Sequence, residues 1–442
     1  MNRIIIADLH EHVDQTVTIA GWVDGRRDHG KLIFLDIRDR SGTLQTVALP
    51  QHDGAHKIAN LVRPEWVLRL TGFVKKRPDK MVNANVPTGD IEMEITDIAV
   101  LSEAEELPFL KDSELNLDTL LDYRPFTMRR ARDRAVFKVQ HEIVRAYREA
   151  LVGEGFIEFQ PPKIVGGDAE GGAGAFKLEY FNDKLAYLAT SPQLYKQIAV
   201  GAFERVFSVG NVFRAEKHST TRHLNEYTSL DAEMGFIKDH TDVMKVLTQV
   251  LGHITKQVAH VCASELSALG AEAPQCPSEF PAMKLREAQE LIKARTGEDC
   301  TSEKDLTPEH ERWLSSHAKE AFNSDFMFVT HFPVEKAAFY AYDDPDDSGF
   351  TRYFDLLFRG VELVSGGQRT HEYAALVAKM RSKGLDPDTF SFYLQAFRYG
   401  MPPHGGWGMG LERLTQKYLG LDNVKEAALF PREINRIDTL LS

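Results

Sequence analysis

The sequence predicts a two-part α+β chain, in which a small five-stranded β-barrel precedes a larger domain of helices and strands. Residues 15–101 read as short strands separated by turn residues. Residues 126–442 instead combine helical periodicity with strands and glycine-rich turns. A chain of 442 residues is long enough for two or more domains with full apolar cores.

The predicted barrel strands occupy residues 15–23, 32–38, 43–49, 66–74 and 90–101. In the second of them, aliphatic residues from Ile33 to Ile37 alternate with Phe34, Asp36 and Arg38. An aromatic ring and a guanidinium are therefore expected on the face away from the core. Five short strands in so few residues fit a Greek-key barrel of the OB type, whose open face binds single-stranded nucleic acid through aromatic and basic groups.

Net charge alone argues against a nucleic-acid partner, because 53 Lys and Arg against 65 Asp and Glu give −12. The acidic excess lies mainly beyond the barrel, since residues 1–100 hold 13 basic and 14 acidic side chains. Clusters of basic residues can contact phosphates even on an acidic protein, although a solvated charged surface is the alternative. Two such clusters are present here: Arg26, Arg27, Lys31, Arg38 and Arg40, and Lys75, Lys76, Arg77 and Lys80.

Several classes of protein are excluded by composition. No run approaches the ~18 consecutive apolar residues that a membrane span needs, and the first 15 residues contain acids where a signal peptide would be apolar. The cysteines, Cys262, Cys276 and Cys300, lack the C-x-x-C spacing of a zinc knuckle and do not suggest a disulfide framework. We therefore expect a cytoplasmic protein with no membrane partner.

An acidic segment without sustained periodicity follows the barrel, and it predicts domains at 1–103 and 126–442 joined by a hinge at 104–125. Apolar residues three and four apart from Val136 to Leu151 then predict an amphipathic helix that Gly153 and Gly155 end. The strand FIEFQPP comes next. Residues 240–325 are predicted to be a mostly helical insertion without obvious chemistry.

A predicted hairpin at residues 208–236 carries the first candidate site. On its first strand Arg214 and Glu216 would share one face. The second strand would add to that polar surface Tyr227, Ser229, Asp231 and Glu233, while its reverse face is apolar and expected to be buried. The connecting loop supplies Arg222 and His223. The pattern predicts a charged sheet floor, with a solvent-facing hairpin as the alternative.

Two further motifs lie near the C-terminus. In RYFDLLFRGVELVSGGQRTHEY, Glu362 and Ser365 offer hard oxygen ligands suited to Mg²⁺ just before a glycine pair that we expect to be flexible, and Arg369 offers a planar fork for a carboxylate. In PPHGGWGMGLERL, glycines open a helix that carries Glu412 and Arg413. Each motif alone is also compatible with a structural turn.

A fourth segment, VGGDAEGGAGAF followed by LATSPQLYKQ, places Glu170 between glycines and then supplies Gln193 and Lys196. A glycine-flanked loop of this kind can move. A single lysine would ordinarily be a solvated surface charge, so the case for Lys196 depends on the other motifs.

Together these motifs resemble those of the class II aminoacyl-tRNA synthetases of the aspartyl, asparaginyl and lysyl subgroup, most closely the aspartyl enzymes of the shorter, archaeal-like form. The resemblance spans the whole chain and rests on three motifs in order: a helix followed by FIEFQPP, FRAE with RHLNEY, and GMGLER. It implies an antiparallel catalytic sheet of six or seven strands flanked by helices, an anticodon-binding OB barrel and a homodimer. It also implies a ligase that activates L-aspartate with ATP and transfers it to the 3′ end of tRNA(Asp).

The resemblance implies a role for each candidate in ATP binding. Arg214 would hold the α-phosphate, Glu216 the adenine side, and Arg222 and His223 the distal phosphates. Arg413 would clamp the γ-phosphate and adenine; the remaining members of the ATP set are Leu224, Gly410, Glu412 and Glu362, with Glu362 and Ser365 binding Mg²⁺. Because the amino acid's own carboxylate is the nucleophile, the reaction needs positioning and charge neutralisation rather than a general base. The catalytic set is therefore Arg214, Arg413 and Lys196.

The choice of amino acid follows from charge. Burying a carboxylate without partners costs several kcal/mol, and Lys196 with Arg369 would offset that cost for the β-carboxylate. Asparaginyl relatives lack this lysine, so Lys196 favours aspartate over asparagine. The substrate's α-ammonium would lie against Glu170, Gln193 and Asp231, with Ser365 in the same pocket. Thr190 departs from the family, whose aspartyl members usually have glutamine there.

In the barrel, the resemblance implies that Phe34 stacks on an anticodon base, Gln45 reads a base edge, and Arg26 and Arg27 lie near phosphates. His29 stands where aspartyl enzymes that also charge tRNA(Asn) carry histidine, which yields the hypothesis of a second tRNA and a tRNA-dependent amidotransferase partner. Three alternatives remain: an asparaginyl-tRNA synthetase, an aspartate-activating amidating ligase, which would lack the barrel, and a catalytically inactive RNA-binding paralogue.

Overall fold

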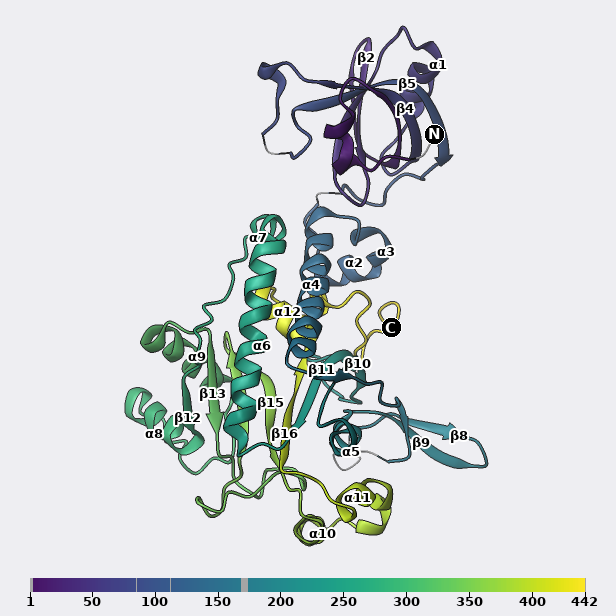
Figure 1. The fold of residues 1–442 in the computed structure, drawn as a ribbon. Coiled ribbons are helices and arrows are strands. Elements are labelled where there is room, and N and C mark those ends of the chain that lie inside the picture. Colours follow the sequence, from purple (N-terminus) through teal and green to yellow (C-terminus); the bar gives the residue numbers. More distant parts are fainter. Residues whose placement is uncertain (1–2, 85, 112, 168–173, 442) are drawn as a thin grey trace. The chain divides into compact units, whose positions relative to one another are not determined.

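The computed structural model describes residues 3–84, 86–111, 113–167 and 174–441, and the chain divides into two compact units, Met1–Ser113 and Glu114–Ser442 (Figure 1). None of the helices in these described ranges combines the length and the apolar composition needed to cross a membrane.

The first unit is a closed five-stranded barrel with strand order β1-β2-β3-β5-β4, in which only the β3–β5 pair is parallel (Figure 1). Its strands are β1 (Thr16–His29), β2 (Leu32–Arg38), β3 (Thr43–Ala48), β4 (Val67–Lys76) and β5 (Ile91–Ser102). They confirm the five predicted strands and the OB fold. Short helices η1 (Ile6–His12), α1 (Asp53–Leu61) and η2 (Asp79–Met81) complete the unit.

The predicted alternation in β2 is correct for the core but wrong for its last residue. Ile33, Leu35 and Ile37 are fully buried. Arg38 is buried as well, because its guanidinium donates to Asp24 at 2.7 Å and to Glu65 at 2.9 Å. It is therefore an internal ion-pair partner rather than an outward cation.

The second unit is built on an eight-stranded sheet with order β12-β13-β14-β15-β16-β11-β10-β6 (Figure 1). The six central strands are antiparallel, and the two edge strands pair in parallel. The strands are β6 (Ile157–Glu158), β10 (Arg205–Phe213), β11 (Glu226–Gly235), β12 (Ala282–Lys284), β13 (Phe326–Thr330), β14 (Tyr353–Phe358), β15 (Val361–Arg369) and β16 (His404–Gly410). A second sheet orders β7 (Ile164–Val165), β9 (Lys184–Leu188) and β8 (Lys177–Tyr180).

Helices cover this sheet and close its core. They are α2 (Leu117–Asp122), α3 (Arg124–Thr127), α4 (Ala131–Gly153), α5 (Gln193–Phe203), α6 (His240–Val261), α7 (Ala263–Leu269), α8 (Leu285–Thr296), α9 (Pro308–Phe322), α10 (Tyr373–Ser382), α11 (Ser391–Arg398) and α12 (Leu411–Leu419), with 3₁₀ turns η3 (Pro387–Phe390) and η4 (Val424–Ala427). Helices α4 and α6 lie side by side (Figure 1), and with α12 they pack on the apolar face of β11 and β16 around Trp407.

The amphipathic helix predicted from Val136 to Leu151 is confirmed as α4, in which the apolar residues of the predicted face are buried: Val136, Val139, Ile143, Tyr147 and Leu151. The hinge at 104–125 is shorter than predicted, since residues 117–127 form α2 and α3. Arg124 explains the difference: it is buried and donates to the carbonyls of Ala428 and Leu429 at 2.9 Å, which fixes this segment to the second unit. Such a long-range contact leaves no periodic signal in the sequence.

Candidate active site

The polar face of the central sheet collects side chains from neighbouring strands. In the register, Asp231 of β11 pairs with Gly408 of β16, Gly408 with Ser365 of β15, and Ser365 with Asp355 of β14. Directly paired residues of antiparallel strands point to the same face. On β11 the reverse face, including Leu230 and Ala232, is buried in the core. The predicted charged floor is therefore present.

Glycines keep this floor open. Gly406, Gly408 and Gly410 occupy alternate positions of β16, so the strand adds no side chain to the polar face. A Cβ on Gly406 would lie 2.3 Å from Oε2 of Glu233. The glycines were expected to open a helix, and α12 does begin at Leu411, but the glycines themselves form a strand.

A pocket over the floor gathers most of the predicted site residues. Glu170 lies outside the residues that the structure describes. Thr190 also lines the pocket, with its side chain buried. The predicted residues that line it are Gln193, Lys196, Arg214, Glu216, Arg222, His223, Leu224, Asp231, Glu362, Ser365, Arg369, Gly410, Glu412 and Arg413.

The two predicted cations are held by acidic partners. Lys196, which is 1% exposed, donates through Nζ to Asp231 Oδ1 at 3.0 Å and to the Trp407 carbonyl at 2.8 Å. Arg369 donates from Nε to Glu233 Oε1 at 2.9 Å. Glu233 also brings its Oε2 within 3.5 Å of Lys196 Nζ, so this one carboxylate orients both cations.

Glu233 has no exposed surface. Burial acts to raise the pKa of its carboxyl group, but the charges of Arg369 and Lys196 outweigh it and hold the pKa below the usual range. The sequence placed Glu233 on the floor without giving it a role. Glu233 contacts two cations from other elements, and the alternation of residues along one strand cannot reveal such contacts.

Two polar groups line the pocket beside the cations: the carboxylate of Asp231, which is suited to an ammonium ion, and the amide of Gln193. Asp231 accepts a hydrogen bond from Ser229 Oγ at 2.5 Å, which fixes the carboxylate beside Lys196. Gln193, at the start of α5, is buried, and its Nε2 atom has no hydrogen-bond partner among the described residues. Because an amide nitrogen is a donor, it is available to an acceptor oxygen of a ligand, whereas an ammonium ion would be met by the amide oxygen.

The strand assignment of Arg214 and Glu216 is wrong, because β10 ends at Phe213 and both residues belong to the following loop. Asn225 shapes this loop by donating from Nδ2 to the carbonyls of Arg214 at 2.6 Å and Glu216 at 3.1 Å. The guanidinium of Arg214 lies 5.6 Å above the ring of Tyr227. The Arg214 backbone N–H also donates to the Asn225 carbonyl at 2.8 Å, so Asn225 holds this segment through both its backbone and its side chain. Asn225 is a positioning residue that the sequence pattern did not single out.

Glu311 of α9 is a second residue that sequence reasoning missed. Its Oε2 accepts hydrogen bonds from the Glu362 backbone N–H at 3.0 Å and from Arg222 Nη1 at 3.3 Å. Arg413 donates from Nη1 to the Glu362 carbonyl at 2.8 Å and from Nη2 to the Arg222 carbonyl at 3.4 Å. The four residues form a ring, through which the helical insertion at 240–325 reaches the site.

The oxygen ligands predicted for Mg²⁺ lie together. Ser365 Oγ donates to Glu362 Oε1 at 2.5 Å. Residues three apart in a regular strand face opposite ways, but Leu356 pairs with Val364 and Leu357 with Glu362, so Leu363 forms a bulge that restores a common face. The following Gly366 and Gly367, predicted to be a flexible pair, lie inside the regular strand β15.

Asp355 completes this oxygen cluster and was not predicted. It is 6% exposed, and its Oδ1 atom has no hydrogen-bond partner among the described residues. Burial and the nearby charge of Glu362 raise the pKa of Asp355 well above its usual range. Such a carboxyl group is costly to ionise unless a cation lies beside it.

Glu412 faces the protein more than the pocket. Both of its carboxylate oxygens accept from the Thr228 backbone N–H, at 3.1 and 3.0 Å, and burial raises its pKa to about 7. The contact joins the start of α12 to β11. The structure thus gives Glu412 a scaffold contact in addition to its place on the pocket wall.

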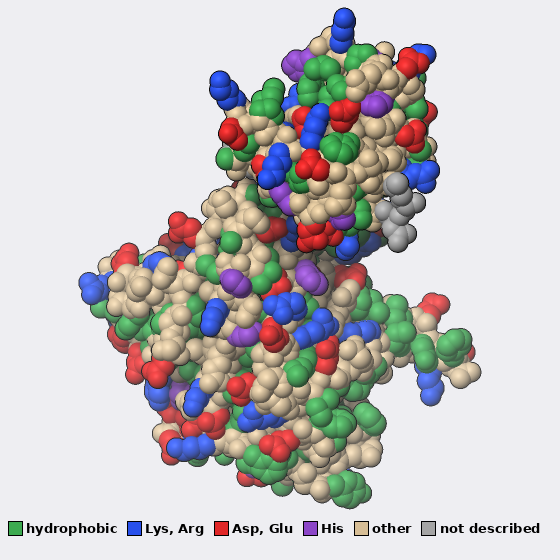
Figure 2. Space-filling model, turned by 45° about the horizontal axis from the view of Figure 1, so that its top comes forward, with side chains coloured by type: hydrophobic (Ala, Val, Ile, Leu, Met, Phe, Trp, Pro, Cys, Tyr) green, Lys and Arg blue, Asp and Glu red, His purple; other side chains and the backbone are tan. Residues whose placement is uncertain are grey.

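In the barrel, four of the five predicted tRNA-contact residues share a face. Arg27 pairs with Phe34 in the register and donates to Gln45 Oε1 at 3.0 Å, while the ring of His29 meets that of Phe34 edge-on at 5.6 Å. Arg26 instead pairs with Leu35, on the other face of β1, and donates to the Ala59 carbonyl at 3.2 Å. Figure 2 shows acidic and basic side chains interspersed on the viewed face rather than a continuous basic area.

Comparison with known proteins agrees with this architecture. Residues 116–434 match the family described as tRNA synthetases class II (D, K and N), and residues 17–101 match the OB-fold nucleic acid binding domain. A relative named aspartate–tRNA(Asp/Asn) ligase from Thermus thermophilus is 45% identical, covering 98% of this chain and 99% of its own; one from Deinococcus radiodurans is 43% identical, with 99% of both chains covered.

Solved structures give the same result. Asparaginyl-tRNA synthetase from Pyrococcus horikoshii, complexed with asparaginyl-adenylate, superposes with a TM-score of 0.91 at 32% identity over 99% of both chains. A putative aspartyl-tRNA synthetase from Leishmania major gives 0.87 at 30% identity over 98% of this chain and 94% of that one. The family match covers most of the chain, including the sheet floor and its pocket, and the chain belongs to the class II tRNA synthetases of the D, K and N group.

Proposed function

We propose that this protein is an aspartate–tRNA ligase, which uses ATP to convert L-aspartate to aspartyl-adenylate and then transfers the aspartyl group to the 3′ end of tRNA(Asp). The observation that carries the proposal is the buried pair Lys196 and Arg369 on the sheet floor. The names of the full-length relatives support the same activity.

Charge balance favours aspartate over its amide. The buried charges of Lys196 and Arg369 balance those of Asp231 and Glu233 in the absence of substrate, and once the substrate's ammonium group pairs with Asp231 one positive charge is left for the β-carboxylate. A β-carboxylate arriving between the two cations gains charge-assisted hydrogen bonds to both. The substrate's ammonium group is matched by the carboxylate of Asp231 and the side-chain oxygen of Gln193. Asparagine offers a dipole in place of the β-carboxylate charge, so it recovers less of the cost of desolvating the cations.

Activation requires positioning more than proton transfer. The α-carboxylate of the bound amino acid attacks the α-phosphorus of ATP, and diphosphate leaves. In the proposal Arg214 neutralises the charge that develops on the α-phosphate, while Arg222, His223 and Arg413 hold the distal phosphates. Leu224, Glu216 and Gly410 would surround the adenine. The ring through Glu311 fixes Arg222 and Arg413 before ATP arrives.

The cluster of Asp355, Glu362 and Ser365 fits Mg²⁺. All three offer hard oxygen atoms as ligands. The buried Oδ1 atom of Asp355 has no hydrogen-bond partner among the described residues, and a divalent cation would supply its missing partner. When bound with ATP, Mg²⁺ supplies charge neutralisation of the phosphates. Glu362 and Ser365 would orient toward it from β15, and Asp355 from β14.

The barrel surface of Arg27, His29, Phe34 and Gln45 is proposed to contact the anticodon, with Phe34 stacking and Gln45 reading a base edge. Arg26 lies on the other face of β1, so it would contact the tRNA phosphate backbone only from that face. His29 leads us to propose tRNA(Asn) as a second acceptor, as in the relatives' names, which would place a tRNA-dependent amidotransferase downstream. A cytoplasmic homodimer is also part of the proposal.

Aminoacylation of tRNA(Asp) and tRNA(Asn) transcripts, with aspartate and asparagine offered separately, tests the proposal. We expect aspartate to be attached to both tRNAs and asparagine to neither. Asparagine on tRNA(Asn) would instead identify an asparaginyl enzyme. Aspartate-dependent exchange of diphosphate into ATP without any charging would favour an amidating ligase, and the absence of both reactions an inactive paralogue.

A further inference from the structure

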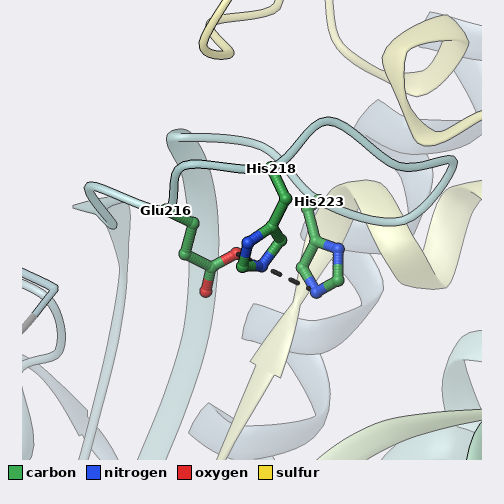
Figure 3. Close-up of side chains that lie close together, drawn as sticks. All are labelled: Glu216, His218 and His223. Atoms are coloured by element: carbon green, nitrogen blue, oxygen red, sulfur yellow. Dashed lines mark ion pairs between the residues drawn. The ribbon is translucent and has the colours of Figure 1, made fainter.

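The loop between β10 and β11 brings together three metal-ligating side chains. The ligand atoms of Glu216, His218 and His223 all lie within 4.8 Å of one another (Figure 3). Glu216 Oε2 is 3.8 Å from His218 Nε2 and 3.9 Å from His223 Nε2. Among the described residues, no other group of three or more histidine, cysteine or acidic side chains brings its ligand atoms this close together.

Neighbouring residues orient two of these ligands. His223 Nδ1 lies 2.6 Å from Thr220 Oγ1, so the hydroxyl occupies one ring nitrogen and leaves Nε2 toward Glu216. A hydrogen bond on the far nitrogen is the usual support of a metal-binding histidine. Glu216 Oε2 is inaccessible to solvent and has no hydrogen-bond partner among the described residues, while Asn225 anchors the backbone of Glu216.

The donor set selects the kind of metal. Two imidazoles and one carboxylate are ligands of Zn²⁺, which takes nitrogen at about 2.0–2.1 Å in a tetrahedral arrangement, whereas Mg²⁺ prefers oxygen alone. Tetrahedral bonds of that length place neighbouring ligand atoms about 3.3 Å apart. The two distances to Glu216 Oε2, 3.8 Å from His218 and 3.9 Å from His223, exceed this value modestly, and all three ligand atoms lie within 4.8 Å of one another. Rotation of His218, whose side chain is 62% exposed, can bring its ring closer, and a small shift of the Glu216 carboxylate can shorten its distance to His223.

We propose that Glu216, His218 and His223 form a Zn²⁺ site whose occupation excludes ATP from the pocket. The exclusion rests on the proposed function, in which Glu216 and His223 are ATP ligands, because neither side chain can serve both ligands at once. Three protein ligands leave a fourth position for water. Zn²⁺ would thus inhibit the enzyme by competing with ATP, and the zinc site includes one residue, His218, that ATP binding does not use.

Metal binding is tested first, on the full-length chain without ATP. Co²⁺ alone, followed by its visible absorption and displaced by Zn²⁺, should bind the wild type at one equivalent. His218→Asn should weaken this binding about tenfold or more, since even the loss of a supporting contact costs 10–100-fold. The matched control is His260→Asn, an exposed histidine of α6 that should leave binding unchanged. Equal affinity in wild type and His218→Asn would overturn the site.

Inhibition is tested by aspartate-dependent exchange of diphosphate into ATP, with Zn²⁺ added at fixed Mg²⁺. His218→Asn should keep the zinc-free rate within about twofold of wild type and need about tenfold more Zn²⁺ for half inhibition. Chelation of Zn²⁺ by ATP is identical for both proteins, so it cannot produce this difference. Equal zinc sensitivity would refute the exclusion of ATP. An absence of exchange in every protein would instead refute the proposed function, while the Co²⁺ measurement would still decide the metal site.

Discussion

The Oε2 atom of Glu311 accepts a hydrogen bond from the backbone N–H of Glu362 at 3.0 Å. The two residues are 51 positions apart, one on α9 and the other on β15. Because the same oxygen also accepts from Arg222, a single carboxylate links an arginine proposed to bind phosphate to a proposed Mg²⁺ ligand. A helix that carries no predicted site residue thereby positions the site.

Glu311→Gln tests this link. An amide oxygen can still accept one hydrogen bond but no longer offers charge to Arg222, so we expect the KM for ATP to rise about tenfold while the KM for aspartate stays within twofold. Diphosphate exchange at varied ATP and varied aspartate measures both constants. Glu309→Gln, at an exposed position of the same helix, is the control. Equal increases in both KM values would mean that Glu311 acts on stability alone.

Lys196→Met should damage aspartate selection. The change keeps most of the length of the side chain and removes its charge, and breaking a buried ion pair costs about 3–5 kcal/mol. We expect the kcat/KM for aspartate to fall by at least about 100-fold and the preference for aspartate over asparagine to narrow. Lys256→Met, exposed on α6, controls for general effects of the substitution. An unchanged preference between the two amino acids would remove the basis of the assignment.

Asp355→Asn should stabilise the protein and weaken its use of Mg²⁺. The pKa of Asp355 is raised by burial and by Glu362, so its charge is unfavourable in the folded protein and an amide should increase the melting temperature without metal. The Mg²⁺ concentration for half-maximal exchange should rise about tenfold. Exposed Asp388→Asn is the control. A lower melting temperature in metal-free buffer would contradict this account of Asp355.

His404 should make the fold sensitive to acid. Burial lowers its pKa to about 4, despite nearby Glu233, with Arg369 and His371 also facing it. In the unfolded chain the pKa of His404 is 6.5, so between pH 6.5 and pH 4 its imidazole is protonated in the unfolded chain and neutral in the folded protein. Stability is therefore lost as pH falls through this window, by about 3 kcal/mol for a shift of this size.

The measurement is the free energy of unfolding by urea at pH 7 and at pH 4.5. His404→Gln should reduce the difference between the two pH values, although it lowers stability at pH 7. His240, whose pKa is also lowered to about 4, keeps part of the acid sensitivity in both proteins. Exposed His260→Gln should retain the wild-type difference. A variant at His404 with the full wild-type pH dependence would refute this assignment.

Phe34→Ala separates the barrel from the catalytic sheet. Stacking on a base contributes about 1–3 kcal/mol, so the KM for tRNA(Asp) should rise about 5- to 150-fold. Diphosphate exchange, which needs no tRNA, should be unchanged. Phe73→Ala removes an exposed phenylalanine from β4 of the same barrel and is the matched control. If Phe34→Ala and Phe73→Ala raised the KM for tRNA(Asp) equally, Phe34 would not be the residue that stacks on an anticodon base.

The sequence by itself determined the elements whose signal is local. Alternation of apolar residues located the five barrel strands and the buried reverse face of β11, and three- and four-residue spacing located α4. Composition and motif order were sufficient for the family. These properties depend on neighbours within one strand or one helix, which is why periodicity reports them.

Only the tertiary structure decided how the site residues meet. The bulge at Leu363 turns Glu362 and Ser365 to one face, and Asn225 holds Arg214 beyond the end of β10 through backbone and side-chain hydrogen bonds. Arg38, expected outside, became internal because Asp24 and Glu65 reach it from other parts of the barrel. The environment of a charge depends on partners distant in sequence, and its burial depends on whether those partners are present. The pattern within one segment therefore identified the chemical groups of the site, whereas long-range packing decided which way each side chain points and which charges are buried beside a partner.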